Sequence, residues 1–232
     1  MGCYSILRSV IDPIHIDRRA CKFEVLSLLL QSTTLHTSFQ IFRDAVNKIS
    51  PIGEDDWQLC EPGLSLKTLD KSAFFVEEGK IYREIGFVVK GLLRAYYLVE
   101  GEEINTAFYM EGQWAKAYHS FLTQTASRQW IQALEDVELI PISYKHLQHL
   151  FANSPAWERF GRIATENLYV ASQLRSEMLL LEKPAERYVN LTRTQPQLLE
   201  RVPLYHLASY IGIKQPSLSR IRKRLAKTNT TL

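Results

Sequence analysis

The chain of 232 residues has few cysteines and no long apolar run, and each shortage excludes a class of protein. Three cysteines without CxxC spacing cannot build a disulfide framework or a four-thiolate metal site. The longest uncharged stretch, residues 25–42, is too rich in Ser, Thr and Gln to supply the roughly 20 apolar residues of a membrane span. Charges near the start interrupt the apolar core of a secretory signal. We therefore expect a cytoplasmic protein with no membrane partner, no metal site and no bound cofactor.

Charge is unevenly distributed along the chain. The composition, 46% hydrophobic and 23% charged, is that of an ordinary globular protein, and the net charge is only +3. Residues 201–232, however, contain seven basic residues and no acidic ones, which leaves 21 basic against 25 acidic in residues 1–200. A mildly acidic body with a strongly basic tail indicates a polyanionic partner for the tail.

The first 34 residues show no sustained periodicity and suggest a helix only around residues 23–30. We hypothesise that the natural start lies near Leu35, which would make these residues an extension of uncertain status. From residue 36 the pattern becomes helical and ends at Ser50-Pro51, with apolar residues at Phe39, Phe42, Val46 and Ile49.

A series of short strands follows, each rich in Val, Ile, Phe and Tyr. Turn-forming pairs such as Lys90-Gly91 and Glu100-Gly101 separate several of them. Many short strands with glycine turns predict a sandwich or a rolled barrel. The predicted strands are Leu64–Leu69, Ala73–Val76, Ile85–Lys90, Leu93–Val99, Ile104–Tyr109, Trp130–Ala133 and Val137–Ile142.

The pattern becomes helical for good after Ile142. A short helix, Tyr144–Phe151, precedes Ser154, which has the character of an N-cap, and Pro155 suits the first helical position. A long helix up to Lys183 then carries a heptad seam, which favours a two-helix dimer over a helix that lies on its own domain. The seam residues are Trp157, Phe160, Ala164, Asn167, Ala171, Leu174, Met178 and Leu181.

The basic tail has the spacing of a helix-turn-helix. After a hinge at Glu182–Pro184 and a short helix at Ala185–Thr192, we expect helices at Leu204–Tyr210 and Gln215–Ala226. Seven positions fit the motif: small Ala208 where the helices cross, Gly212 in the turn, and apolar Leu207, Ile211, Ile213, Leu218 and Ile221 between the helices.

The second helix of this motif would present a DNA-reading face. With Leu218, Ile221 and Leu225 turned inward, Arg220 can pair with guanine in the major groove and Gln215 with adenine. The other residues suit phosphates, which position a protein without reading sequence. The predicted DNA-contacting residues are Tyr205, Lys214, Gln215, Ser217, Ser219, Arg220, Arg222, Lys223 and Arg224.

The chain resembles the Crp/Fnr family of bacterial transcription regulators, in the branch common in Bacteroidetes-type bacteria, over residues 36–227. The most telling stretches are Gly91-Leu92-Leu93-Arg94, Gln132-Ala133-Leu134-Glu135-Asp136, Ala208-Ser209-Tyr210-Ile211-Gly212-Ile213 and Ser217-Leu218-Ser219-Arg220-Ile221-Arg222-Lys223. The resemblance implies an α+β fold with a double-stranded β-helix, a jelly roll related to cyclic-nucleotide-binding domains. It also implies a long dimerisation helix and a C-terminal DNA-binding domain.

Four segments follow from this resemblance. They are an N-terminal extension (1–34), a β-roll sensor domain with flanking helices (35–153), a dimerisation helix (154–183) and a helix-turn-helix domain (184–232). The expected partners are a near-palindromic DNA operator and a second copy of the chain, with RNA polymerase as a further candidate.

The effector site of the resembled family is altered in this sequence. Gly112-Gln113-Trp114 stands where cyclic-nucleotide binders have Gly-Glu-Leu, so the carboxylate for the ribose is lost. Arg128-Gln129-Trp130 retains only the arginine of the phosphate-binding stretch. Cyclic AMP is therefore disfavoured, and the effector pocket expected around Gln113, Trp114, Arg128 and Gln129 would take an unidentified small molecule. An iron–sulfur cluster is excluded because the N-terminal cysteine cluster is missing.

Three functions remain open at this point. The first is a DNA-binding regulator with a β-roll sensor, and the second is a constitutive regulator whose β-roll is only a scaffold. The third, a cupin-like enzyme, needs histidines and a carboxylate inside the barrel, whereas only His119 lies in the strand region, with His146 and His149 on the next helix. We therefore expect a protein that is not an enzyme.

Overall fold

The structure is a computed structural model that describes residues 35–229, with side chains to residue 227. The described residues from 41 onward belong to one compact unit. The predictions for residues 1–34 lie outside the described residues. Residues 35–49 are helical and end before Pro51, which confirms the helix predicted there. No helix within residues 35–229 is long and apolar enough to cross a membrane.

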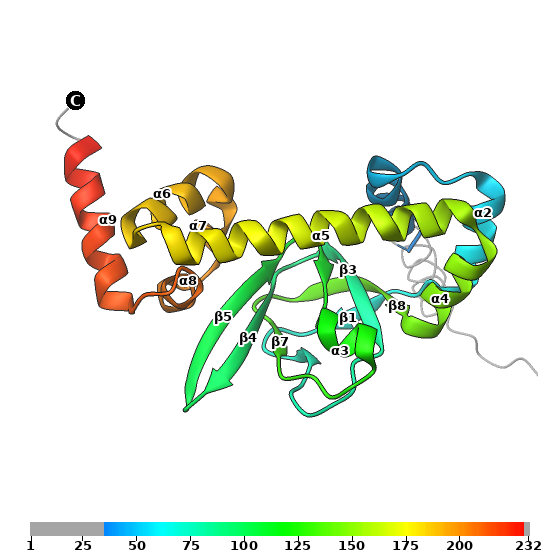
Figure 1. The fold of residues 1–232 in the computed structure, drawn as a ribbon, viewed down its shortest axis with the longest axis horizontal. Coiled ribbons are helices and arrows are strands. Elements are labelled where there is room, and N and C mark those ends of the chain that lie inside the picture. The colour runs from blue at the N-terminus through cyan, green and yellow to red at the C-terminus, as the bar shows by residue number, and fades with distance from the viewer. Residues whose placement is uncertain (1–34, 230–232) are drawn as a thin grey trace, which may run out of the picture. The chain divides into compact units, whose positions relative to one another are not determined.

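Two four-stranded antiparallel sheets make up the β-roll (Figure 1). One has the strand order β1-β8-β3-β6, and the other β2-β7-β4-β5. The strands are β1 (Lys67–Leu69), β2 (Phe74–Val76), β3 (Glu84–Lys90), β4 (Leu93–Val99), β5 (Glu102–Tyr109), β6 (Trp114–Ala115), β7 (Trp130–Ala133) and β8 (Val137–Ser143). The predicted α+β fold with a rolled, jelly-roll β-domain is confirmed.

The β-roll core follows from the apolar strands. Phe87 pairs in register with Ile140 across β3 and β8, and both side chains are fully buried, as are Leu93 and Ile131 on the second sheet. Burial of each such side chain stabilises the fold by about 1.5–3 kcal/mol. Gly91, between β3 and β4, has a φ of 93°, and an added Cβ would lie 2.3 Å from the Asp136 carbonyl oxygen. The Lys90-Gly91 turn therefore requires glycine.

Short helices close one end of the β-roll. They are α2 (Glu54–Cys60), the 3-10 turn η1 (Glu61–Gly63), α3 (Tyr118–Thr123) and α4 (Tyr144–Asn153). The fully buried Trp157 ring packs edge-on against Trp57, at 5.2 Å between ring centroids. Its indole N–H donates to the Asp56 carbonyl at 3.0 Å. Trp157 thereby ties the start of the long helix to α2.

The long helix α5 (Pro155–Leu181) begins as its sequence predicts. The Ser154 hydroxyl accepts a hydrogen bond from the Trp157 backbone N–H at 3.1 Å, and Pro155 occupies the first turn, where its missing N–H costs nothing. The helix ends at Glu182 in extended backbone.

Four further helices complete the chain: α6 (Pro184–Thr194), α7 (Pro196–Arg201), α8 (Leu204–Tyr210) and α9 (Gln215–Asn229). The bounds of α8 and the start of α9 agree with the prediction. Gly212 takes a φ of 73° in the turn between them, and the Ile213 N–H donates to the Ala208 carbonyl at 2.9 Å. We refer to α8 and α9 as the C-terminal helix pair.

Candidate nucleic-acid interface and effector cavity

The outer face of α9 carries most of the residues predicted to contact DNA. Leu218 is fully buried and Ile221 and Leu225 pack beside it against the core, which turns Ser219, Arg220 and Lys223 to the opposite side. Arg220 and Lys223 are exposed, and Ser219 is half-buried. The helix therefore presents one continuous basic face.

The remaining predicted residues lie around this face. Arg222 and Arg224 are exposed and flank it on either side, since each lies about a quarter-turn from the buried stripe. Ser217 is half-buried at the start of α9, and Lys214 and Gln215 are exposed there. Tyr205, at the start of α8, is 52% exposed. Tyr205, Lys214 and Gln215 line a hollow of about 550 Å³ together with residues of β5.

An ion pair joins the start of α9 to the β-roll. The Lys214 ammonium donates to both carboxylate oxygens of Glu102 on β5, at 2.5 and 2.6 Å. Both side chains are largely exposed, so the pair contributes at most about 1 kcal/mol to stability. Lys214, which is predicted to contact a phosphate, therefore already has an acidic partner within the chain.

A buried polar network lies beneath this ion pair. Arg94 on β4 is 4% exposed, and its guanidinium pairs with the Glu103 carboxylate and donates to Gln132 Oε1 at 2.7 and 3.1 Å. Its third partner is His206 Nδ1 on α8, at 3.0 Å. Burial, reinforced by the charge of Arg94, lowers the pKa of His206 to about 4. The neutral ring therefore accepts the hydrogen bond, and Arg94 links the sheet to the C-terminal helix pair.

Ser209 of α8 continues the hydrogen bonding of β5. The Asn105 backbone N–H donates to Ser209 Oγ at 2.9 Å, and the same hydroxyl donates to the Glu103 carbonyl at 2.7 Å. β5 lies at the edge of its sheet, where backbone groups have no neighbouring strand. Ser209 therefore satisfies two edge groups that a further strand would otherwise pair.

Three further arginines, one each on α5, α6 and α7, make contacts around the C-terminal helices. Arg201 of α7 donates to the carboxylates of Glu111 and Glu135 at 2.7–3.0 Å. The pKa of Glu111 falls to about 2, chiefly through the hydrogen bonds from Arg201. Arg187 of α6 donates to the Ile211 carbonyl at 2.8 Å, and Arg175 of α5 lies over the Tyr210 ring at 3.9 Å.

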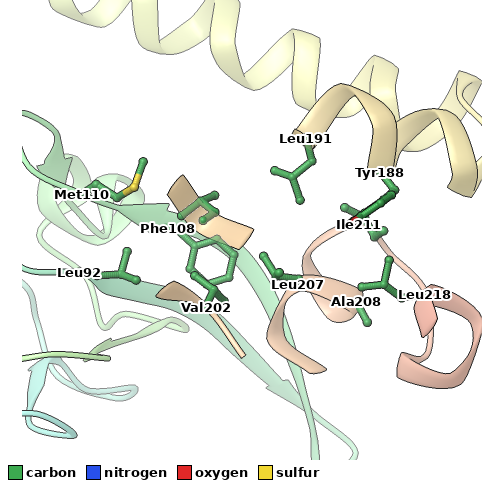
Figure 2. Close-up of a cluster of buried hydrophobic side chains, with 11 residues drawn as sticks. Leu92, Phe108, Met110, Tyr188, Leu191, Val202, Leu207, Ala208, Ile211 and Leu218 are labelled. Carbon is green, nitrogen blue, oxygen red and sulfur yellow. The ribbon is translucent and has the colours of Figure 1, made fainter. Parts of the chain in front are cut away.

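Apolar side chains fill the space between these polar contacts (Figure 2). Leu92, Phe108 and Met110 of the β-roll belong to one buried cluster with Val202, which follows α7, and Leu207 of α8. The Phe108 ring also packs edge-on against Tyr210, at 5.1 Å between centroids. Neither this cluster nor the arginine contacts could be predicted from local sequence patterns, because their partners lie far apart along the chain.

The predicted dimer seam divides into a buried and an exposed part. Trp157 and Phe160 are buried in the core of their own chain, and Ala164 is half-buried. Asn167 and Ala171 are exposed, as are Leu174 at 60% and Leu181 at 79%, while Met178 is half-buried. Val170, 55% exposed, belongs to the same stripe and was not predicted.

The comparisons with known proteins agree with this architecture. A family model described as the cyclic nucleotide-binding domain matches residues 66–154. These residues are therefore similar to a cyclic nucleotide-binding domain. No curated protein sequence matches the chain.

Solved structures extend the likeness from this domain to most of the chain. FixK2 from Bradyrhizobium japonicum is 16% identical, with a TM-score of 0.61 over 72% of this chain and 86% of that one. The c-di-GMP responsive global regulator CLP from Xanthomonas campestris is 16% identical, with a TM-score of 0.57 over 76% and 93%. A protein from Eubacterium rectale described as a transcriptional regulator of the Crp/Fnr family is 13% identical, with a TM-score of 0.58 over 76% and 85%. The expected Crp/Fnr-type fold is confirmed.

The predicted effector residues of the cyclic nucleotide-binding domain lie in different settings. Gln113 is exposed and its side chain accepts from the Met110 N–H at 3.1 Å within its own turn. Arg128 is exposed, and the Gln129 amide donates to Thr106 Oγ1 at 3.2 Å. Trp114 alone among the four lines a partly open, mostly apolar cavity of about 110 Å³, which no sequence pattern indicated.

The histidines considered for an enzyme are also separate from one another. His119 is exposed on α3, His146 Nε2 lies 3.0 Å from the Cys60 carbonyl oxygen, and His149 contacts the Asn153 amide. Within residues 35–229, no three His, Cys, Asp or Glu side chains gather as a metal site would require.

Proposed function

We propose that this chain is a cytoplasmic, homodimeric, sequence-specific DNA-binding transcription regulator of the Crp/Fnr type. The observation that carries the proposal is the exposed basic face of α9, opposite the buried Leu218. In a helix-turn-helix, the second helix enters the major groove with such a face. Arg220 would donate two hydrogen bonds to guanine O6 and N7, and Gln215 would pair with adenine.

Phosphate contacts would hold this helix in register. Lys223 would reinforce the reading face, and the exposed Arg222 and Arg224 on either side of it would contact phosphates. Lys214, Ser217, Ser219 and Tyr205 would complete the contacts around the start of the helix. These contacts position the protein without reading sequence, and they make binding depend steeply on salt.

Dimerisation would use the exposed stripe of α5. Asn167, Val170, Leu174 and Leu181 fall on one narrow side of the helix because it turns once every 3.6 residues. Apolar residues of this exposure at heptad spacing favour a second copy of the same helix, with Asn167 setting the register. Two recognition helices would then read half-sites about 34–36 Å apart.

The decisive experiment selects bound sites from random DNA and then tests Arg220→Ala on the selected operator. The variant should lose about 1–3 kcal/mol of binding free energy and tolerate any base at one position of each half-site. Arg159→Ala is the matched control and should bind normally. It removes an exposed arginine near the start of α5 and leaves α9 unchanged. Equal base selectivity of Arg220→Ala and the unmodified protein would refute the assignment of the reading face.

A second candidate is a regulator that binds DNA without any effector. It is favoured by the use of Gln113 within its own turn and by the exposure of Arg128, since neither residue then forms a nucleotide site. Operator affinity measured with and without cyclic nucleotides and small metabolites separates the two candidates. A reproducible ligand-induced change in operator affinity excludes the constitutive regulator.

A further inference from the structure

A partly open cavity lies between α3, α4 and the first half of α5. Its volume is about 110 Å³, and apolar side chains form nearly all of its wall, among them Trp114, Phe121, Phe151, Trp157, Phe160 and Leu168. An apolar cavity of about 150 Å³ in another protein stays dry and takes up benzene, so a single aromatic ring is the appropriate scale of ligand.

Among the described residues, Lys116 is the one lysine that lines this cavity. It directly follows β6, which ends at Ala115, and its side chain is half-buried. Burial lowers the pKa of Lys116 to about 8, so the group still carries its charge at neutral pH. The cavity therefore combines aromatic side chains with a half-buried lysine in its wall.

The hydrogen bonding of Lys116 is incomplete. Its ammonium donates to the Trp114 carbonyl at 3.1 Å and lies 5.6 Å from the Tyr109 ring centroid. No carboxylate among residues 35–227 forms an ion pair with it. An ammonium has three donors, and buried charges in proteins are usually paired with an opposite charge. An anion would complete the interactions of this ammonium.

Part of the rim of the cavity is polar. Tyr118 on α3 and Thr165 on α5 both line it, and their hydroxyl oxygens lie 3.0 Å apart in a hydrogen bond. This bond joins the short helix to the long one beside the cavity.

We propose that this cavity is the binding site of a small apolar monocarboxylate of about the size of benzoate. The carboxylate would pair with Lys116, and the hydrocarbon part would lie against Trp114, Phe121 and Phe160. Of the four residues predicted for the effector pocket, only Trp114 lines this site, whereas Gln113, Arg128 and Gln129 do not.

Occupancy of this site would act on the long helix. Trp157, Phe160, Gly161, Ala164, Thr165 and Leu168 of α5 belong to the wall, and the exposed stripe proposed for dimerisation begins at Asn167. A ligand that contacts one face of α5 would therefore shift this helix, which would set the spacing of the two recognition helices in the proposed dimer. This regulatory part of the inference rests on the proposed function, whereas ligand binding itself does not.

The test is calorimetric titration of the full chain with benzoate and hexanoate, with benzyl alcohol as the neutral probe. We expect one site per chain, with benzoate binding at least ten-fold more tightly than benzyl alcohol at pH 7. Affinity for benzoate should fall as the pH rises through 8, because Lys116 then loses its proton. Affinity for benzyl alcohol should not change over this range. Absence of binding by both carboxylates, or equal binding of benzoate and benzyl alcohol, overturns the proposal.

Three variants make the result specific. Lys116→Met keeps the length of the apolar stem and should bind benzoate and benzyl alcohol equally, whereas Lys145→Met, which changes an exposed lysine on α4, should behave like the unmodified chain. Ala164→Phe fills the cavity and should abolish binding of both probes while the melting temperature shows a folded protein. A Lys116→Met chain that still prefers benzoate, or an Ala164→Phe chain that still binds it, contradicts the assigned site.

Operator binding is measured separately so that the two proposals fail independently. If benzoate binds and operator affinity does not change, the proposed binding site is supported and its proposed regulatory role is refuted. If the chain binds no DNA at all, the proposed function falls and the titration still decides whether the cavity binds a carboxylate.

Discussion

Arg94 is the residue on which the attachment of the C-terminal helices most depends. Its guanidinium is 4% exposed and reaches a carboxylate, an amide oxygen and an imidazole nitrogen from three different elements. Removing one partner of such a group leaves a buried charge or donor uncompensated, which costs more than an exposed ion pair contributes. The network therefore specifies one arrangement of these elements and tolerates few alternatives.

His206 makes the stability of this network depend on pH. Its folded pKa of about 4 lies below the ordinary value of 6.5, so the unfolded chain binds a proton first as the solution becomes acidic. Stability from this group is therefore present above pH 6.5 and is lost as the pH falls from 6.5 toward 4, by on the order of 2–3 kcal/mol. Urea unfolding at several pH values measures the effect.

His206→Gln provides the comparison, because an amide retains a hydrogen-bond acceptor and does not titrate. The variant should show a flatter stability profile between pH 6.5 and 4. Below pH 4.5 both proteins should lose further stability as Glu111, with its pKa of about 2, becomes protonated in the unfolded chain first. A His206→Gln profile that still falls as steeply between pH 6.5 and 4 would show that other groups cause the loss.

Gly91 provides a second test at the scale of one residue. Gly91→Ala places a Cβ 2.3 Å from the Asp136 carbonyl oxygen in a backbone with a φ of 93°, and should destabilise the protein by about 2–4 kcal/mol. Gly79 has a similar φ of 84° with no atom within 4 Å of the added Cβ. Gly79→Ala should therefore cost only about 1 kcal/mol in the same denaturation experiment. Equal losses for the two variants would show that the close approach to Asp136 is relieved without cost.

At the scale of elements, α5 has two parts with different roles. Its first turns pack into the core of the chain, and its exposed stripe is proposed to bind a second copy. Leu174→Asp places a charge in the exposed stripe and should shift the protein from dimer to monomer in sedimentation analysis, while far-UV dichroism stays the same. Leu180→Asp is the matched control, because Leu180 is 81% exposed on another side of the same helix. A dimer that survives Leu174→Asp and dissociates with Leu180→Asp would move the association face to the other side of α5.

The elements that could be predicted from the sequence are those with strong local signals. Ser154 and Pro155 announce the start of α5, and the spacing around Gly212 announces the turn between α8 and α9. The missed elements, α2, α3, α7 and β6, are seven residues or shorter. Two turns of helix show too few apolar positions for a 3.6-residue period to stand out.

The site was predictable only in part, for a related reason. The basic face of α9 follows from one helix and its period, so its residues could be named in advance. The partners of Arg94 cannot be found in this way, since His206 lies 112 positions away on α8. Likewise Lys116 falls in a short segment without periodicity, and its burial depends on α3 and α5 packing over it.

At the scale of the whole molecule, the ion pair between Lys214 and Glu102 should influence the salt dependence of DNA binding. A phosphate that takes Lys214 must displace a carboxylate, which then requires a counterion of its own. Glu102→Gln should therefore tighten operator binding at low salt and steepen the slope of log affinity against log salt by about 0.9. Filter binding over a range of salt concentrations measures both.

Glu100→Gln is the matched control for this prediction, because it removes the same charge from the adjacent hairpin turn and leaves the contact with Lys214 in place. A general effect of acidity near DNA would change both variants alike. The specific effect of the ion pair predicts a change in slope for Glu102→Gln alone, and equal slopes for the two variants would contradict it.

The cover that α8 provides over β5 also has a consequence for solubility. Ser209 occupies two backbone groups of an edge strand that would otherwise invite pairing with a strand of another chain. Any condition that lifts the C-terminal helix pair from the sheet therefore uncovers a template for strand addition. Detachment of the C-terminal helix pair from β5 would then be observed as concentration-dependent aggregation before unfolding is observed. The serine that attaches the helix pair to the sheet therefore also prevents β5 from pairing with a strand of another chain.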